Sequence, residues 1–204
     1  MLNEPKNATM EELKVMWNGI APVYTTFDAT MQTFYYTLAS MMKIPEARHI
    51  YEVGCGIGKM IPYTISLKPE DCTYLATDLS EKMVEMSRNY LAGYIHKLGL
   101  CDNVDKWMER MRLEIGVHDG ECMFKPTHKF DRIICNLVLM NTNDAHKMMQ
   151  SMHEVADEGC LLGVSVWGDK RMSNFMNLPM EAKITLGKPV ANVRDNFYLH
   201  NKLE

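Results

Sequence analysis

Residues that could do chemistry begin at 51–60, where the sequence YEVGCGIGKM places an acidic side chain before three alternating glycines. Gly54, Gly56 and Gly58 lack a Cβ atom, so a ligand can approach the main chain closely and the turn can adopt positive φ angles. The spacing differs from the G-x-G-x-x-G fingerprint of dinucleotide-binding folds, and no phosphate-binding P-loop motif occurs. Glu52 would repel a pyrophosphate, but its carboxylate suits a ligand that carries an ammonium and a sulfonium group.

Polar residues also end the next three predicted strands. Asp78 ends CTYLATD, Asp119 ends RLEIGVHD, and Asn136 follows the apolar run FDRIIC. An acidic residue at the end of a second strand can accept hydrogen bonds from both hydroxyls of a ribose, and Asp119 is placed to accept one from an adenine amino group. Because parallel sheets bind ligands at the carboxyl ends of their strands, these residues predict a binding site at that edge.

Each of these residues also has a purely structural interpretation. The glycines could form only a tight turn, and Asp78 could simply precede Ser80, the N-cap of the next helix. Asp119 could be an ordinary turn residue, and Asn136 could cap the end of its strand.

The elements that must position these residues alternate between strand and helix patterns. Strands are predicted at 48–53, 72–78, 112–119, 129–139 and 159–169, and helices at 9–21, 28–42, 58–67, 80–99, 103–111 and 145–155. The first helix opens with a capping box at Thr9 and Glu12, and Pro22 is expected to break it. This alternation predicts an α/β three-layer sandwich with a mostly parallel central sheet and a helical N-terminal extension.

Composition limits the function classes. The chain has 204 residues, 47% of them hydrophobic and 24% charged, with a net charge of −4, as expected of one soluble globular domain. No block of lysines and arginines favours nucleic-acid binding, and no segment predicts a signal peptide or membrane span. The 19 methionines could fill the core or line an adaptable apolar pocket.

Six single cysteines form no CxxC pair, so a zinc knuckle is not expected. Three of them lie in or beside apolar runs, which suits reduced thiols and predicts a cytoplasmic protein. Neither an HExxH motif nor a paired HxH motif occurs, so no metal is predicted.

Four segments together resemble the class I (Rossmann-like) S-adenosylmethionine-dependent methyltransferases, particularly the small-molecule branch that includes the C-methyltransferases of ubiquinone and menaquinone biosynthesis. They are WNGIAPVYTTFD, YEVGCGIGK, YLATDLSEKMVEMSR and the region from FDRIICNLVL to GVSVWG. The resemblance covers about residues 13 to 204. It implies S-adenosylmethionine as the cofactor and S-adenosylhomocysteine as its product.

The resemblance also implies the cofactor-binding residues. Glu52 would orient the ammonium group, Asp78 would hold the ribose, Asp119 would meet the adenine amino group, and Tyr24 would lie over the cofactor or only pack there. The full set is Tyr24, Glu52, Gly54, Cys55, Gly56, Gly58, Asp78, Leu79, Met83, His118, Asp119, Gly120, Asn136 and Leu137.

The implied reaction is an in-line displacement at a sulfonium, whose leaving group is a neutral thioether and needs no acid. A general base is needed only if the acceptor must lose a proton, and no residue is identified as that base. For His118 a packing role is preferred to that of a base, and His146 and His153 are expected to be surface or packing residues of a helix. Met140 occupies a position where relatives often have histidine.

The acceptor is expected to be a small, apolar or aromatic molecule. Asn136 is followed by LVL and not by the two prolines of methyltransferases that modify amino groups of adenine or glutamine. Two alternatives stay open: a catalytically inactive methyltransferase-like protein that acts as a partner subunit, and a nicotinamide-dependent dehydrogenase, which the glycine spacing and Glu52 oppose.

Three parts of one methyltransferase domain are expected: an N-terminal helical lid at 1–45, a cofactor-binding core at 46–168 and an atypical substrate cap at 169–204. The family's sheet usually has a final antiparallel hairpin, which is not recognisable in this sequence. An incomplete sheet would expose an edge and an apolar face. A second copy or a partner chain is therefore expected to cover it.

Overall fold

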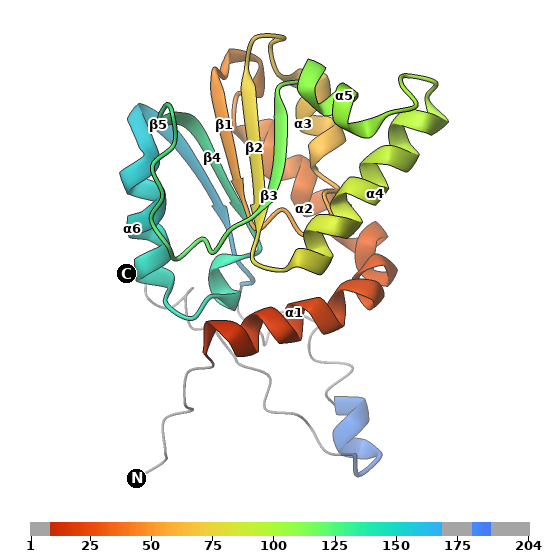
Figure 1. The fold of residues 1–204 in the computed structure, drawn as a ribbon. Coiled ribbons are helices and arrows are strands. Elements are labelled where there is room, and N and C mark those ends of the chain that lie inside the picture. Colours follow the sequence, from red (N-terminus) through yellow and green to blue (C-terminus); the bar gives the residue numbers. More distant parts are fainter. Residues whose placement is uncertain (1–8, 169–180, 189–204) are drawn as a thin grey trace.

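The computed structural model describes residues 9–168 and 181–188, and its centre is a parallel sheet (Figure 1). Five strands lie in the order β3-β2-β1-β4-β5, and every pairing between neighbours is parallel. Their bounds are β1 His49–Val53, β2 Thr73–Asp78, β3 Leu113–Val117, β4 Phe130–Asn136 and β5 Ala156–Ser165. The strand order reverses between β1 and β4, so a ligand crevice is expected beyond the carboxyl ends of these two strands.

Helices cover both faces of the sheet, as the alternation predicts. On one face α2 Asp28–Met41, α3 Ile61–Leu67, α4 Glu81–Lys97 and α5 Val104–Arg110 pack over Ile50 and Ile134. On the other face α6 Ala145–Val155 packs its buried Met148 and Met152 against Tyr51. Neighbouring strand residues therefore point into two separate cores, which confirms the three-layer architecture.

Helix α1, Met10–Tyr24, runs across the carboxyl ends of the strands (Figure 1). The capping box at Thr9 and Glu12 is confirmed, but the expectation that Pro22 breaks the helix is wrong, because α1 continues to Tyr24. Proline removes only one backbone donor, and the hydroxyl groups of Thr25 and Thr26 donate to the Pro22 and Val23 carbonyls at 3.3 and 2.7 Å. A 3₁₀ turn, Thr25–Phe27, then leads into α2.

Three predicted strands end too late, and the one expected at 159–169 is β5, which begins at Ala156 and ends at Ser165. The strand expected at 129–139 ends at Asn136, because Leu137 adopts a left-handed conformation with φ of 57° and a 3₁₀ turn follows at Leu139–Asn141. The strand expected to reach Asp119 ends at Val117. The proposed cap at 169–204 lies outside the described residues except for 181–188, where residues 181–185 are helical.

Candidate functional site

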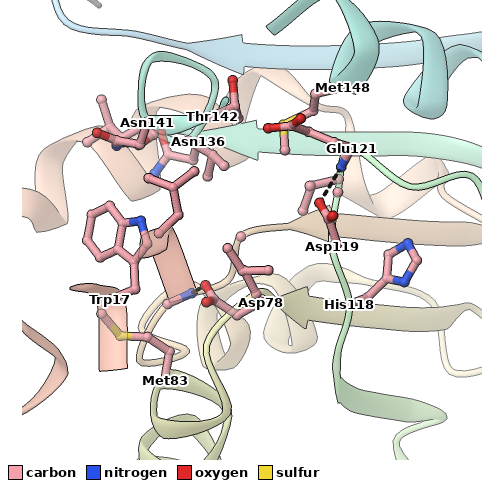
Figure 2. A pocket seen from close by; sticks show the side chains of 18 of the residues that line it. Trp17, Asp78, Met83, His118, Asp119, Glu121, Asn136, Asn141, Thr142 and Met148 are labelled. Atoms are coloured by element: carbon pink, nitrogen blue, oxygen red, sulfur yellow. Dashed lines mark hydrogen bonds between the residues drawn. The ribbon is translucent and has the colours of Figure 1, made fainter. Parts of the chain in front are cut away.

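A cavity opens at the carboxyl edge of β1, β2 and β4, where ligands of parallel α/β sheets bind. Most of the residues predicted from the resemblance line it (Figure 2). They are Tyr24, Gly54, Gly56, Asp78, Leu79, Met83, His118, Asp119, Gly120, Asn136 and Leu137. The strand ends named in the sequence therefore meet at one cavity.

The glycine loop between β1 and α3 needs its glycines for backbone conformation. Gly54, Gly56 and Gly58 have φ angles of 69°, 54° and 74°, a region that side-chain-bearing residues rarely adopt. A Cβ atom on Gly54 would overlap Val138, whereas one on Gly56 would meet nothing within 4 Å. Gly56 thus leaves its main chain open to a ligand.

Gly58 has a different role. It lines neither this cavity nor its smaller neighbour, and a Cβ atom there would overlap the Ser87 side chain of α4. Its position allows close packing of the loop against α4 and does not provide a direct ligand contact.

Asp78 is held rigidly at the end of β2. Its Oδ2 atom accepts a hydrogen bond from Gly56 N and its Oδ1 atom one from Ser80 N, both at 2.9 Å. Burial raises the pKa of Asp78, and the bonds from Ser80 and Gly56 act in the opposite direction. Ser80 is also the N-cap of α4 and accepts from Met83 N at 3.0 Å. Each carboxylate oxygen keeps a lone pair for a ligand hydroxyl.

A second, smaller cavity adjoins the first at the glycine loop. Four residues line both cavities: Tyr24, Gly54, Gly56 and Asn136. The smaller cavity adds Tyr35, Glu52, Cys55, Ile57, Lys59 and Met60. The two cavities together could hold the two ends of an elongated ligand, and the middle of that ligand would then lie at the four shared residues.

Glu52 lies behind the glycine loop and is only 4% exposed. Burial raises its pKa to about 7, although the hydroxyl of Tyr74, which donates a hydrogen bond to Oε2, acts in the opposite direction. The carboxyl group is therefore ready to ionise when a cationic group binds beside it.

The loop after β3 contributes both a turn and a cavity wall. Asp119 Oδ1 accepts from Glu121 N at 2.9 Å, so the turn interpretation of Asp119 is confirmed, and the same side chain lines the cavity. His118 packs edge-to-face on Phe124 with 4.8 Å between ring centroids, and its Nε2 atom lies 3.0 Å from the Cys122 carbonyl oxygen. A Cβ atom on Gly120 would lie 2.6 Å from Met148 Cε.

Asn136 ends β4 and is tied to β5. Ser165 Oγ donates a hydrogen bond to Asn136 Oδ1, and Leu137 N donates to both the carbonyl oxygen and the Oγ atom of Ser165, at 3.1 and 3.0 Å. Asn141 Nδ2 donates to the Leu137 carbonyl at 2.9 Å. These bonds hold the turn in which Leu137 is left-handed.

Nine residues that line the larger cavity were not predicted from the sequence to be part of the site. They are Met10, Leu13, Trp17, Val53, Glu121, Val138, Asn141, Thr142 and Met148. The helical spacing of Leu13 and Trp17 indicates a packed face but not that this face closes a cavity. Glu121 is buried and accepts from Asn143 N at 2.5 Å and Asp144 N at 3.1 Å, which positions the start of α6.

The other candidate histidines lie away from both cavities. His146 and His153 are exposed on α6, and neither lines a described cavity. Met140 is buried in a cluster with Met31 and Leu137. Among residues 9–168 and 181–188, no three acidic, histidine or cysteine side chains are arranged to hold a metal ion, and no helix there has the length and apolar character of a membrane span.

Comparison with solved structures places the fold among known α/β enzymes. The [4+2]-cyclase SpnF aligns at a TM-score of 0.63 with 14% identity, over 81% of this chain and 62% of that one. A complex of the Haloferax volcanii Trm112 methyltransferase activator with a putative methyltransferase aligns at 0.60 with 14% identity, over 90% and 75%. DesVI of Streptomyces venezuelae aligns at 0.52 with 18% identity, over 75% and 59%. The chain thus spans less than two thirds of SpnF and DesVI.

No curated protein sequence matches the chain, but a family model does. The model described as a methyltransferase domain matches residues 51–162, which include the glycine loop and all cavity residues from β1 to β4. That match supports S-adenosylmethionine as the cofactor, and the open backbone at Gly56 with the carboxylate of Asp78 fits such a ligand. The chain therefore belongs to the methyltransferase domain family and has the α/β fold of class I methyltransferases.

Proposed function

We propose that this protein transfers a methyl group from S-adenosylmethionine to a small, apolar or aromatic molecule by in-line displacement. One observation carries the proposal: Asp78, fixed at the end of β2, is hydrogen-bonded to Gly56 of the glycine loop, and both residues line the same cavity. A ribose with two hydroxyl groups matches the lone pairs that this carboxylate keeps.

The two cavities divide the cofactor between them. In the larger one, Asp78 would hold the ribose, Leu79 would pack on the adenine and Asp119 would accept from its amino group. In the smaller one, the backbone beside Cys55 and the Glu52 carboxylate would receive the amino-acid end. When bound, the cofactor supplies an electrophilic methyl group: the acceptor's lone pair forms the new bond, the carbon–sulfur bond breaks, and sulfur keeps the electron pair as a neutral thioether.

The chain's own contribution is position and exclusion of water. Holding two reactants in line can lower a barrier by roughly 7–11 kcal/mol without any acid or base. Helix α1 closes the cavity with Leu13, Trp17 and Tyr24, so we propose that residues 1–45 act as a lid over the core at 46–168. We propose further that 169–204 caps the acceptor.

Apolar and sulfur-containing side chains favour an apolar or aromatic acceptor. Met10, Leu13, Trp17 and Met148 line the larger cavity, and a cluster that includes Met31, Tyr35, Met140 and Trp167 packs against Leu137 next to it. Methionine adapts to ligands of different shape. The N-terminal WNGIAPVY segment is the reason to propose an acceptor of the ubiquinone or menaquinone precursor type.

We propose that a second copy or a partner chain covers the outer edge of β5. In the part of the chain that the structure describes, β5 is the last strand of the sheet, and Leu161 and Leu162 on it are 36% and 41% exposed. The neighbour from Haloferax volcanii is a complex with an activator protein, which makes a partner chain a reasonable occupant. Light scattering that gives a monomer would contradict the second copy.

The test is calorimetric titration with S-adenosylmethionine, S-adenosylhomocysteine and NADH. Micromolar binding of the first two, and none of NADH, is expected. Asp78→Asn should weaken that binding at least about tenfold, because one of its oxygens becomes a donor facing a backbone N–H. Asp71→Asn, the same change at an exposed turn, should leave it unchanged. Tight NADH binding would support the alternative function as a nicotinamide-dependent dehydrogenase. Failure to bind either methionine derivative would support the alternative of a catalytically inactive partner subunit.

A further inference from the structure

Asn136 lies where the reacting centre of the proposed methyl transfer would be. The two cavities meet at Tyr24, Gly54, Gly56 and Asn136, which line both of them. With the nucleoside in the larger cavity and the amino-acid end in the smaller one, the sulfur that joins them falls at these shared residues. The inference below therefore rests on the proposed function.

The hydrogen bonds around Ser165 fix which end of the Asn136 amide faces this centre. Ser165 Oγ accepts from Leu137 N at 3.0 Å, so its own proton is available to Asn136 Oδ1. If the amide were turned, Ser165 Oγ would face two N–H donors and its proton would lose this acceptor. Within the described residues, no acceptor takes the Asn136 Nδ2 hydrogens. The amide therefore presents donors to the cavity.

Other donors gather beside Asn136. Tyr24 and Tyr35 come from α1 and α2, and both line the smaller cavity. Burial raises the pKa of Tyr24, and its hydrogen bond with Tyr35 acts in the opposite direction, so the two hydroxyl groups lie next to each other. Lys59 also lines the smaller cavity, with its ammonium group 3.9 Å from the centroid of the Tyr90 ring. The carboxyl group of Glu52, which also lines that cavity, accepts a hydrogen bond from Tyr74 and is the group proposed to receive the cofactor's ammonium.

We infer that the methyl acceptor is an oxygen nucleophile of the phenol type, which binds as its oxyanion against Asn136 Nδ2. One lone pair of the oxygen accepts from the amide while another attacks the methyl carbon. The phenol proton passes to solvent on binding, the oxygen–carbon bond forms, and the carbon–sulfur bond breaks with its electron pair left on sulfur. An amine acceptor needs an acceptor for its N–H hydrogens, whereas the Asn136 amide directs its carbonyl oxygen to Ser165 Oγ and its N–H donors to the cavity.

The test uses the full chain and a matched pair of probes, 4-nitrophenol and 4-nitroaniline. S-adenosylhomocysteine is titrated first by calorimetry. Failure at this stage would defeat the proposed function itself. Each probe is then added to the complex with S-adenosylhomocysteine, and visible absorbance reports how much nitrophenol is ionised. We expect nitrophenol to bind as the phenolate, with its pKa lowered, and at least about tenfold more tightly than nitroaniline, because a hydrogen bond to a charged group is stronger.

Two variants and a control locate the effect. Asn136→Asp should remove the preference for nitrophenol, because a carboxylate would then face the phenolate, and Ser165→Ala should reduce it by freeing the amide to turn. Asn103→Asp makes the same charge change at the exposed N-cap of α5, which aspartate also caps, and should leave the preference intact. Equal affinity for the two probes in the wild-type chain, binding of neither, or a preference that survives Asn136→Asp would overturn the inference.

Discussion

Ser80 Oγ donates a hydrogen bond to Asn18 Oδ1 across 2.6 Å, and this contact joins α1 to the first turn of α4. Lys82 N donates to the same oxygen at 3.1 Å. Ser80 N in turn donates to Asp78, the carboxylate proposed to hold the ribose. The helix that closes the cavity is thus fastened to the turn that would bind the cofactor.

Asn18→Ala should loosen this closure. It removes the acceptor for Ser80 Oγ and Lys82 N, each bond being worth about 1 kcal/mol, so S-adenosylhomocysteine should dissociate up to about thirtyfold faster. Stopped-flow displacement measures the rate. Asn18→Asp keeps an acceptor oxygen and should restore much of the slow dissociation. Unchanged rates in Asn18→Ala would show that α1 closes the cavity without this contact.

Gly54→Ala should abolish cofactor binding and lower stability. Its Cβ atom would overlap Val138 and the φ of 69° disfavours alanine, so a loss of about 1–3 kcal/mol in the free energy of unfolding is expected. Gly93→Ala is the matched control, because that glycine lies in α4 with nothing within 4 Å of a Cβ atom. There alanine should stabilise by about 0.5–1 kcal/mol. Urea unfolding compares the two, and equal effects would contradict the assigned role of Gly54.

Glu52 should make stability fall as pH rises. Its pKa is about 7 in the folded chain and 4.5 as the ordinary value, so the folded state retains a proton that the unfolded state releases. Stability from this group is present below pH 4.5 and is lost as pH rises through 7, by about 3 kcal/mol in total. The free energy of unfolding of Glu52→Gln, relative to that of the wild type, should therefore increase between about pH 5 and 8. Urea unfolding at a series of pH values measures this free energy. The same pH dependence in both proteins would contradict the prediction.

Cofactor binding should show the opposite dependence on pH. An ammonium group beside Glu52 favours the ionised carboxylate, so binding of S-adenosylhomocysteine should release a proton below pH 7 and strengthen as pH approaches that value. Calorimetry in two buffers of different ionisation enthalpy measures the released proton. Glu52→Gln should show no such release. Equal release from both proteins would assign the proton to another group.

The sheet and most site residues were predictable because they depend on local patterns. Buried parallel strands are continuous apolar runs, as in FDRIIC, and each strand end carries its polar residue directly in the sequence. Asp78 and Asn136 could thus be assigned to one edge of the sheet from the order of residues alone. The glycine loop was recognisable because only glycine suits its conformation.

The rest depends on contacts between distant segments. The resemblance of the WNGIAPVYTTFD segment implies a lid, but no local pattern shows that Leu13 and Trp17 close the cavity, and the bond between Asn136 and Ser165 joins residues 29 apart. Such contacts appear only when the chain is folded.

Amide hydrogen exchange of the full chain, with and without S-adenosylhomocysteine, tests the central claim most directly. We predict slower exchange in the glycine loop at 54–58, at the start of α4, in residues 118–121 directly after β3 and in α1. A separate groove is lined by Thr73, Leu113 and Phe130 among others, at the amino-terminal ends of β2, β3 and β4. Amide exchange around that groove should not change. Protection in that groove, or protection nowhere, would contradict the assignment of the cofactor site.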